Sequence, residues 1–320
     1  MRLSITKVHG SGNDFPLVDA RALDLPDAIW AGIARALADR SGPVGGDGML
    51  ALARGDAAHP FAMRMWNADG SEAETCLNGL RCVARAGFEA LDIDRADVKL
   101  KMSSASVRRD DALAPGVVTI RETAGPAGLD TRAFPIVGAP DRLVEARVPG
   151  LPSERLFTAV TMPNPHLVAF VDRVDDAELS ALGAVCESAP DWLPNRANLS
   201  FVELRGADLF VRTFERGVGL TDSCGSAMAA STYAACLTGR VPFARALTVF
   251  NRGGKVRAEA LDDGMVTLSG NATVEWRGSV EVDWQAGRAD ALEVECRYDE
   301  EVAAWATVLA GIDGAGPSKD

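Results

Sequence analysis

The chain has 320 residues, of which 47% are hydrophobic and 24% charged, a composition typical of a globular protein with a sizeable core. Its formal net charge is −12 and it lacks clustered Lys and Arg, so we expect no nucleic-acid partner. No apolar run approaches the roughly 18 residues of a membrane helix. The first residues show no signal-peptide pattern, so we expect a cytoplasmic protein without a membrane partner.

Short apolar runs separated by turn residues predict β-strands in the first half of the chain. These runs lie at residues 15–18, 48–52, 61–66 and 117–120. Apolar side chains at helical spacing then predict a helix over residues 81–91, and Cys76 stands where this helix opens.

The second half contains the same kinds of element. Candidate strands lie at residues 156–161, 167–171, 199–204 and 209–214. A helix is predicted from about residue 225 to residue 237, directly after Cys224. Residues 284–320 form a C-terminal extension to which the sequence assigns no role, with an amphipathic candidate helix over residues 300–309.

The two halves also match each other, which indicates a duplicated domain. In the first half, Arg64 in an apolar strand stands twelve residues before Cys76. In the second half, Arg212 stands twelve residues before Cys224. We therefore expect two similar domains, each of which presents a cysteine at the start of a helix.

The six cysteines show no recognisable metal or disulfide pattern. The spacings C-x5-C from Cys76 to Cys82 and C-x11-C from Cys224 to Cys236 are not those of zinc ribbons. The cysteines are also too sparse for a disulfide scaffold. We expect no metal, and each cysteine remains open to interpretation as a buried core residue or as a reactive thiol.

Two cysteines at helix starts are suited to one particular chemistry. The unpaired N–H groups and the positive dipole end of a helix stabilise a thiolate, so the pKa of such a cysteine falls toward neutral pH. The same N–H groups hold a carboxylate. With Cys76 and Cys224 on opposite faces of an amino acid, one thiolate removes the α-proton while the other thiol protonates the opposite face. This inverts the stereocentre without a cofactor.

Polar turns near these helices supply candidate binding groups. Asn13 lies in the tight turn HGSGND, and Asn164 lies in a similar loop before an apolar run. The turn NADGSEAE precedes the first cysteine, and FERGVG, with Glu215 and Arg216, precedes the second. Each segment also fits a plain structural interpretation as a turn or a surface salt bridge.

Taken together, these segments resemble the diaminopimelate epimerase family. The matching segments, in family order over roughly residues 1 to 280, are HGSGNDF (9–15), GGDG (45–48), NADGSEAETCLNGLRC (67–82), TMPNPH (161–166), PNRANLSFVE (194–203) and FERGVGLTDSCGSA (214–227). The resemblance implies an α+β fold of two pseudo-symmetric domains, each a mixed and antiparallel β-structure wrapped around a central helix, with the active site in the interdomain cleft. We expect these domains over residues 1–125, with a returning strand near 271–283, and over residues 126–270.

The resemblance implies that LL-2,6-diaminopimelate, the expected small-molecule partner, is epimerised to its meso form without a cofactor, as a step of lysine and peptidoglycan-precursor biosynthesis. A homodimer is compatible with this resemblance. Cys76 and Cys224 match the catalytic cysteines, and His166 and Glu215 match groups that tune them. The implied substrate contacts are the side chains of Asn13, Asn67, Asn164, Asn198 and Arg216, and the helix-start N–H groups near Leu77, Asn78, Gly225 and Ser226. The guanidinium of Arg216 suits a second carboxylate, which it binds through two parallel hydrogen bonds.

The chain departs from the family pattern at three positions. Leu77 stands where the family has a glycine, so its side chain would crowd the carboxylate, and leucine does not readily adopt a positive φ. Pro163 replaces another glycine and lacks an N–H donor, and Leu220 replaces a glutamate. We expect these changes to affect the choice of substrate rather than the two thiols.

Three rival functions remain open. The nearest is a racemase of proline, hydroxyproline or histidine from the same superfamily, but proline-racemase-like enzymes carry a histidine where this chain has Asn78. Such an enzyme has no clear use for groups that suit a second aminocarboxylate end. The leucine and proline departures fit a non-catalytic amino-acid-binding protein. A cysteine hydrolase is the third rival, although His166 lacks a recognisable partner pattern.

Overall fold

The computed structural model describes residues 1–74 and 76–313. These residues form two compact units: unit 1 is Met1–Glu122 with Ser269–Gly311, and unit 2 is Thr123–Leu268 with the described residues from Ile312 onward. Within the described part of the chain, no helix has both the length and the apolar composition needed to cross a membrane.

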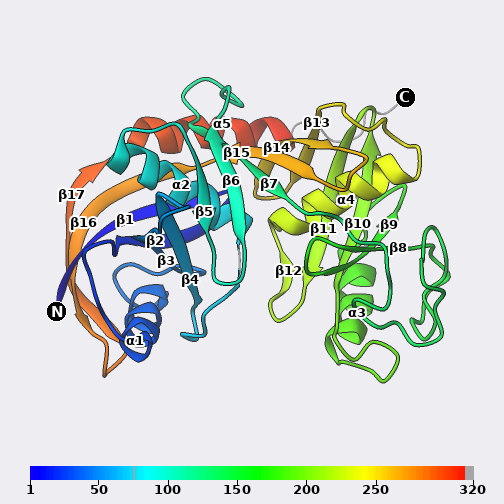
Figure 1. Cartoon of the computed structure of the whole chain (residues 1–320), viewed down its shortest axis with the longest axis horizontal. Helices are drawn as coiled ribbons and strands as arrows, with labels where there is room; N and C mark the ends of the chain where they lie inside the picture. The colour runs from blue at the N-terminus through cyan, green and yellow to red at the C-terminus, as the bar shows by residue number, and fades with distance from the viewer. Residues whose placement is uncertain (75, 314–320) are drawn as a thin grey trace. The chain divides into compact units, whose positions relative to one another are not determined.

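Unit 1 is a curved mixed β-sheet with helices against both faces (Figure 1). Its elements are β1 (Arg2–Gly10), β2 (Asn13–Asp19), α1 (Asp27–Ala38), β3 (Gly48–Arg54), β4 (Phe61–Asn67), α2 (Leu77–Leu91), β5 (Arg95–Lys99), β6 (Ser104–Arg109), β16 (Thr273–Asp283), β17 (Arg288–Arg297) and α5 (Asp299–Asp313), and β7 (Thr119–Ala124) leads the chain into unit 2. Neighbouring strands follow the order β17, β16, β1, β2, β3, β4, β5, β6, β7. The pairs β2–β3 and β4–β5 are parallel, and the other pairs are antiparallel.

The central helix of unit 1 is α2, which contacts β1 to β6, whereas α1 contacts β2, β3, β4, β16 and β17 (Figure 1). Strand β3 shows how both faces are covered. Met49 and Ala51 pack into the core that contains α1, and Leu50 faces Gly79 of α2. A strand buried on both faces has a continuous apolar run rather than alternating polar and apolar residues.

Unit 2 repeats this plan around α4 (Figure 1). Its elements are β8 (Thr158–Thr161), β9 (Pro165–Phe170), α3 (Asp176–Glu187), β10 (Asn198–Arg205), β11 (Asp208–Glu215), β12 (Gly219–Thr221), α4 (Gly225–Leu237), β13 (Leu247–Asn251) and β14 (Gly254–Ala260), and β15 (Val266–Asn271) leads the chain back into unit 1. Helix α4 contacts β8 to β11 and β14, and α3 contacts β10, β11 and β12. The residues of α4 are nearly all small and buried, which suits a helix enclosed on every side.

The strand pairing confirms the predicted duplication. The pairs β9–β10 and β11–β13 are parallel, as are β2–β3 and β4–β5 in unit 1. Arg64 of β4 pairs with Ala51 of β3, and Arg212 of β11 pairs with Phe201 of β10. In each unit, the strand that carries the arginine precedes the central helix, with the short strand β12 between the two in unit 2. The two arginines therefore occupy equivalent places.

The predicted strands and helices fall largely within observed ones, with two kinds of difference. The strand expected over residues 117–120 begins only at Thr119, because Val117 N–H donates to Ala114 O in a turn. Sequence analysis also did not predict α1, α3 or several strands. Helix α1 carried a usable signal, since its buried Trp30, Ile33 and Leu37 recur at helical spacing.

The described part of the C-terminal extension packs onto unit 1. Strand β17 pairs with β16, and Glu301 of α5 binds Arg85 of α2 through Nη1–Oε2 (2.5 Å) and Nη2–Oε1 (2.8 Å). Glu301 Oε2 also accepts a hydrogen bond from Val274 N–H at 3.2 Å. Trp305 is buried, and its ring centroid lies 6.1 Å from that of His9. Helix α5 is thus tied both to the central helix and to the sheet.

We predict that Glu301→Gln lowers the free energy of unfolding by about 1–2 kcal/mol, because the largely buried Arg85 loses a charged partner but keeps Glu89. Glu300→Gln is the matched control, since Glu300 is an exposed neighbour on the same helix. Urea denaturation monitored by circular dichroism measures both variants. Equal free energies of unfolding for the two variants would show that this ion pair adds no stability.

Candidate functional site

Cys76 is the N-cap residue of α2. Its backbone is extended (φ −151°, ψ 111°), and its Sγ accepts a hydrogen bond from Gly79 N–H at 3.4 Å. The half-buried Sγ also lies 3.6 Å from Asn13 Oδ1, within range for its S–H to donate to that oxygen. An N–H donor and the positive end of the helix dipole both favour negative charge on this sulfur.

The glycine at position 79 allows the start of α2 to approach β3 closely. A Cβ atom there would lie 2.7 Å from Leu50 Cδ2 and 3.6 Å from Cys76 Sγ. Leu77 is the first residue of α2 and is 9% exposed. The concern about a positive φ at Leu77 is therefore wrong for this chain, since a helical residue has a negative φ. Its backbone N–H lies at the helix start, where helices leave such donors unpaired.

Asp47, which sequence analysis did not single out, holds Asn13. Asn13 Nδ2 donates to Asp47 Oδ2 at 2.5 Å, and Asp14 N–H donates to the same oxygen at 3.2 Å. Arg40 Nη2 then bridges Asp14 Oδ1 (2.7 Å) and Asp47 Oδ1 (2.6 Å). Because its amide nitrogen is held in this way, Asn13 presents its oxygen to Cys76. The available signal was the GGDG segment, which carries this acid between glycines.

The other two predicted asparagines of unit 1 bind different partners. Asn67 Nδ2 donates to Ser71 Oγ at 2.9 Å in the exposed turn after β4. Asn78 is 2% exposed, and its Oδ1 accepts a hydrogen bond from Arg81 Nη2 at 2.7 Å. Arg81 is itself buried and paired with Glu122 at 2.6 Å. The Asn78 side chain thus belongs to a buried polar cluster, so the candidate donor at this position is its backbone N–H.

Cys224 is the N-cap residue of α4, with an extended backbone (φ −128°, ψ 109°) and 8% exposure. Its Sγ lies 3.5 Å from Ser226 Oγ. Burial raises the pKa of the Cys224 thiol well above its usual value, and the Glu215 carboxylate raises it further. Hydrogen bonds from the Ser226 hydroxyl and the Ala227 N–H favour the thiolate but do not overcome the burial.

The structure thus corrects the expectation that a helix start lowers the pKa of both thiols. The helix dipole acts on Cys224, but the apolar enclosure of α4 withdraws water from the sulfur. Loss of hydration penalises the thiolate more than the helix end stabilises it. At neutral pH Cys224 is therefore a protonated thiol.

Four predicted residues of unit 2 form a connected polar chain. Asn164 Oδ1 lies 3.0 Å from His166 Nε2, and Asn198 Nδ2 lies 3.5 Å from the same nitrogen. Asn198 Oδ1 accepts a hydrogen bond from Arg216 N–H at 2.8 Å. The exposed Arg216 side chain donates through Nη1 to Asn195 O at 3.1 Å. The parallel pairing of β9 with β10, which places His166 opposite Asn198, brings these side chains together.

His166 is fully buried and uncharged at neutral pH. Burial, together with a smaller effect of the Arg216 charge, lowers the pKa of His166 to about 3. Among the residues that the structure describes, none makes a hydrogen bond to His166 Nδ1. A neutral ring supplies no permanent charge to a thiolate, so its contribution is limited to hydrogen bonding.

Glu215 and Arg216 are adjacent in the chain but interact with different residues of the site. The β11–β12 hairpin pairs Glu215 with Gly219, and Thr221 Oγ1 donates to Glu215 Oε1 at 2.5 Å. Glu215 acts on the pKa of Cys224, while Arg216 joins the polar chain of His166. This hairpin therefore links the two clusters of predicted residues in unit 2.

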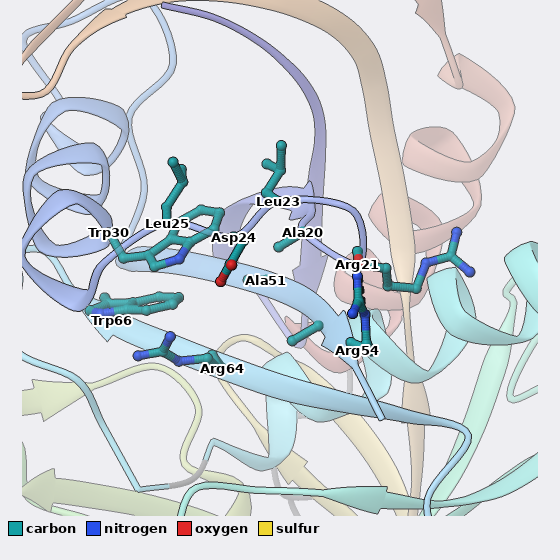
Figure 2. Close-up of a pocket in the computed structure, with 11 residues that line it drawn as sticks. Ala20, Arg21, Leu23, Asp24, Leu25, Trp30, Ala51, Arg54, Arg64 and Trp66 are labelled. Atoms are coloured by element: carbon teal, nitrogen blue, oxygen red, sulfur yellow. Dashed lines mark hydrogen bonds between the residues drawn. The ribbon is translucent and has the colours of Figure 1, made fainter. Parts of the chain in front are cut away.

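A separate cavity of about 360 Å³ lies on the α1 side of the sheet of unit 1 (Figure 2). Apolar side chains such as Trp30 and Trp66 line it together with Arg21, Arg54 and Arg64. None of the predicted site residues lines this cavity. Across the described residues, no group of three or more His, Cys, Asp or Glu side chains is arranged to hold a metal ion.

Comparison with known proteins identifies relatives over most of the chain. The family model described as diaminopimelate epimerase matches residues 5–110 and 158–275. A diaminopimelate epimerase from Clostridium acetobutylicum is 37% identical over 290 residues, which cover 88% of this chain and 87% of that protein. Another, from Bacillus cereus, is 34% identical over 294 residues, which cover 89% of this chain and 99% of that protein.

Solved structures share the fold at much lower identity. A hydroxyproline epimerase from Agrobacterium vitis has a TM-score of 0.63 and 14% identity, with 89% of this chain and 94% of that chain covered. A methylitaconate-delta-isomerase has a TM-score of 0.63 and 13% identity, with 92% and 98% covered. These similarities agree with the predicted α+β fold. Since the family match includes both cysteine segments and most of each unit, the chain belongs to the diaminopimelate epimerase family.

Proposed function

We propose that this protein is an isomerase that converts LL-2,6-diaminopimelate to meso-diaminopimelate without a cofactor, with Cys76 and Cys224 as acid and base. The observation that supports this proposal is the repeated placement of a cysteine at the N-cap of a central helix, in a chain of this family. Units 1 and 2 would be the two domains that contribute these thiols.

The reacting carboxylate would bind to backbone N–H groups at the two helix starts. The candidate donors are the N–H groups of Leu77 and Asn78 on α2 and of Gly225 and Ser226 on α4. These donors also stabilise the enolate-like charge that develops when the α-proton leaves. The weak acidity of that proton makes this stabilisation necessary.

The two sulfurs differ in a way that suits opposite roles. Cys224, which burial keeps protonated, would serve as the acid. Cys76, which accepts a hydrogen bond from Gly79 N–H and faces Asn13 Oδ1, would serve as the base once its S–H has lost its proton. Cys76 takes the α-proton on one face, and the S–H of Cys224 delivers its proton to the other face. The reaction leaves Cys76 as a thiol and Cys224 as a thiolate, and proton exchange with water resets the pair.

The distal aminocarboxylate group would be bound by Asn67, Asn198 and Arg216, with further contacts from Asn13 and Asn164. Arg216 suits this role because its side chain is exposed while Asn198 holds its backbone N–H. A guanidinium binds a carboxylate through two parallel hydrogen bonds.

We further propose a reducing, cytoplasmic location. Every cysteine is a free thiol in the structure, and the mechanism requires two of them to remain reduced. Thiols of this kind persist in the cytoplasm rather than in oxidising compartments.

A second candidate is epimerisation of a cyclic amino acid, because the fold is shared with a hydroxyproline epimerase. Asn78 distinguishes the two candidates, since a histidine in this place is typical of the proline-racemase-like enzymes. The choice between them depends on the substrate that exchanges its α-proton.

We predict that the reduced protein, incubated with LL-diaminopimelate in D₂O without added cofactor, produces the meso isomer with deuterium at the inverted α-carbon. Chiral chromatography with mass spectrometry measures both changes. Parallel incubations with L-proline, trans-4-hydroxy-L-proline and L-histidine test the second candidate. Exchange confined to one of these three would replace the proposed substrate, and no exchange with any amino acid would refute an epimerase.

We expect Cys76→Ala and Cys224→Ala each to lower kcat by about 10²–10⁴-fold, because each removes one of the two proton-transfer groups. Cys296→Ala is the matched control, since Cys296 is exposed and outside both helix starts. Steady-state assays in the direction of the meso isomer measure the change. Wild-type turnover in either single variant would contradict the two-thiol mechanism.

We predict that iodoacetamide at about pH 8 modifies Cys224 more slowly than Cys296. A raised pKa leaves the Cys224 thiol protonated at this pH, and its thiolate fraction increases only as the pH rises toward that pKa. Peptide mass spectrometry after timed alkylation from pH 6 to pH 11 measures both rates. Equal rates for the two cysteines near pH 8 would show that burial does not suppress the Cys224 thiolate.

A further inference from the structure

Arg212 ties the segment before Cys224 to the start of helix α3. Its side chain is only 4% exposed. Nη1 donates to the carbonyl oxygen of Thr221 and to Asp222 Oδ1, the latter at 3.0 Å. Nε donates to Asp176 Oδ1 at 3.2 Å. We name this group of Arg212, Asp176 and Asp222 the Arg212 brace.

Arg64 makes an equivalent set of contacts in unit 1. Its Nε donates to Glu72 Oε1 at 2.7 Å, and its Nη2 donates to Asp27 Oδ1 at 2.7 Å. Its guanidinium carbon lies 4.5 Å from the ring centroid of Trp66, beside which Figure 2 shows it. We name this group of Arg64, Asp27 and Glu72 the Arg64 brace.

The two braces connect equivalent parts of the fold. Asp27 is the first residue of α1 and Asp176 is the first residue of α3, the helix that joins the equivalent parallel strands of its unit. Glu72 and Asp222 both lie between the arginine-bearing strand and its cysteine, although at different distances from that cysteine. The same set of contacts therefore recurs with the same topology in both units.

The turn of a neighbouring hairpin provides a second tie in each unit. In unit 2, Gly253 N–H donates to Asp222 O at 3.0 Å, just after β13. In unit 1, Lys101 Nζ donates to Glu72 O at 3.2 Å, just after β5. Glu72 and Asp222 are thus each held between the arginine of their own unit and the next hairpin. Such double anchoring fixes the direction from which the chain enters the helix.

The direction of chain entry matters because an N-cap residue must keep an extended backbone, as Cys224 does. A sulfur displaced by about 1 Å loses its alignment with the bond that it must protonate or deprotonate. The buried Arg212 and the less exposed acids Glu72 and Asp176 contribute to stability, whereas ion pairs to well exposed acids contribute little. Asp27 and Asp222 are such acids, with side chains that are 83% and 69% exposed.

We propose that Arg212 is a positioning residue, which holds the segment before Cys224 so that the sulfur meets the α-carbon in a reactive geometry. Arg64, which binds Glu72 in the same way, is its equivalent in unit 1. This inference rests on the proposed function. Neither arginine needs to touch the substrate. The planar guanidinium suits this role because it binds acceptors in two directions at fixed angles, which a lysine ammonium does not.

The test compares Arg212→Met and Arg212→Lys with Arg155→Met. Arg155 is the matched control because it also binds an acid of α3, through Nε–Oε1 (2.6 Å) and Nη2–Oε2 (2.7 Å) of Glu178. It lies outside the segment that leads to Cys224. The readouts are kcat, KM, the thermal midpoint and the pH profile of Cys224 alkylation by iodoacetamide.

For Arg212→Met we expect kcat to fall by about 10–100-fold, with a smaller change in KM, because the thiol is misplaced while the binding groups remain. Cys224 should be alkylated faster at a given pH, since a looser segment admits water and relieves the burial that raises its pKa. Arg212→Lys should lie between Arg212→Met and wild type. Arg155→Met should keep the wild-type kcat and alkylation profile, whatever its thermal midpoint.

If Arg212→Met does not fold, the same measurements on Arg212→Lys and Asp222→Asn test the proposal, since both are milder changes to the Arg212 brace. The proposal would be overturned if the folded Arg212 variants kept both the wild-type kcat per folded molecule and the wild-type alkylation profile. An equal loss of kcat in Arg155→Met would also overturn it. If the wild-type protein epimerises no amino acid, the proposed function fails, and the alkylation profiles alone then decide whether the brace positions Cys224.

Discussion

The enclosure of a helix start by its own sheet is the constraint on which this structure depends. In each unit one helix packs inside a curved mixed sheet, and a cysteine caps its N-terminus. The N–H groups at such an end have no partners within the helix, so they require a side chain, water or a ligand. A carboxylate next to a thiol satisfies that requirement. In the proposed reaction, one carboxylate satisfies it at both helix starts.

A helix start packed against its sheet affects a cysteine sulfur in two opposing ways. The helix end stabilises the thiolate, whereas the loss of water destabilises it. The surroundings of the two sulfurs differ. Cys76 is half-buried and receives a hydrogen bond from Gly79 N–H, whereas Cys224 is nearly buried and close to the Glu215 carboxylate. Dehydration outweighs the dipole of α4 and keeps Cys224 protonated. The proposed reaction needs one thiolate and one thiol at the same time, and a Cys224 that stays protonated supplies the thiol.

The duplication extends from topology to individual contacts. Arg64 and Arg212 hold equivalent positions on β4 and β11. Arg64 donates a hydrogen bond to the first residue of α1, and Arg212 donates one to the first residue of α3. The asparagine loops have diverged further: Asn13 is held by Asp47, while Asn164 contacts His166. The framework that places the two cysteines is therefore shared by the two units, while the asparagine loops bind different partners.

The sequence by itself determined the duplication, the central helices and the two cysteines at their starts, because apolar spacing and turn residues report local structure directly. Through its family motifs it also pointed to the α+β class and to His166, Asn198 and Arg216. Only the tertiary structure decided that Asp47 holds Asn13, that the Asn78 side chain turns to Arg81, and that the pKa of Cys224 rises. These outcomes depend on burial and on contacts between residues far apart in the chain. The hydration of a side chain and its distances to its partners set its charge and reactivity. Both are fixed only when the sheet packs around its helix.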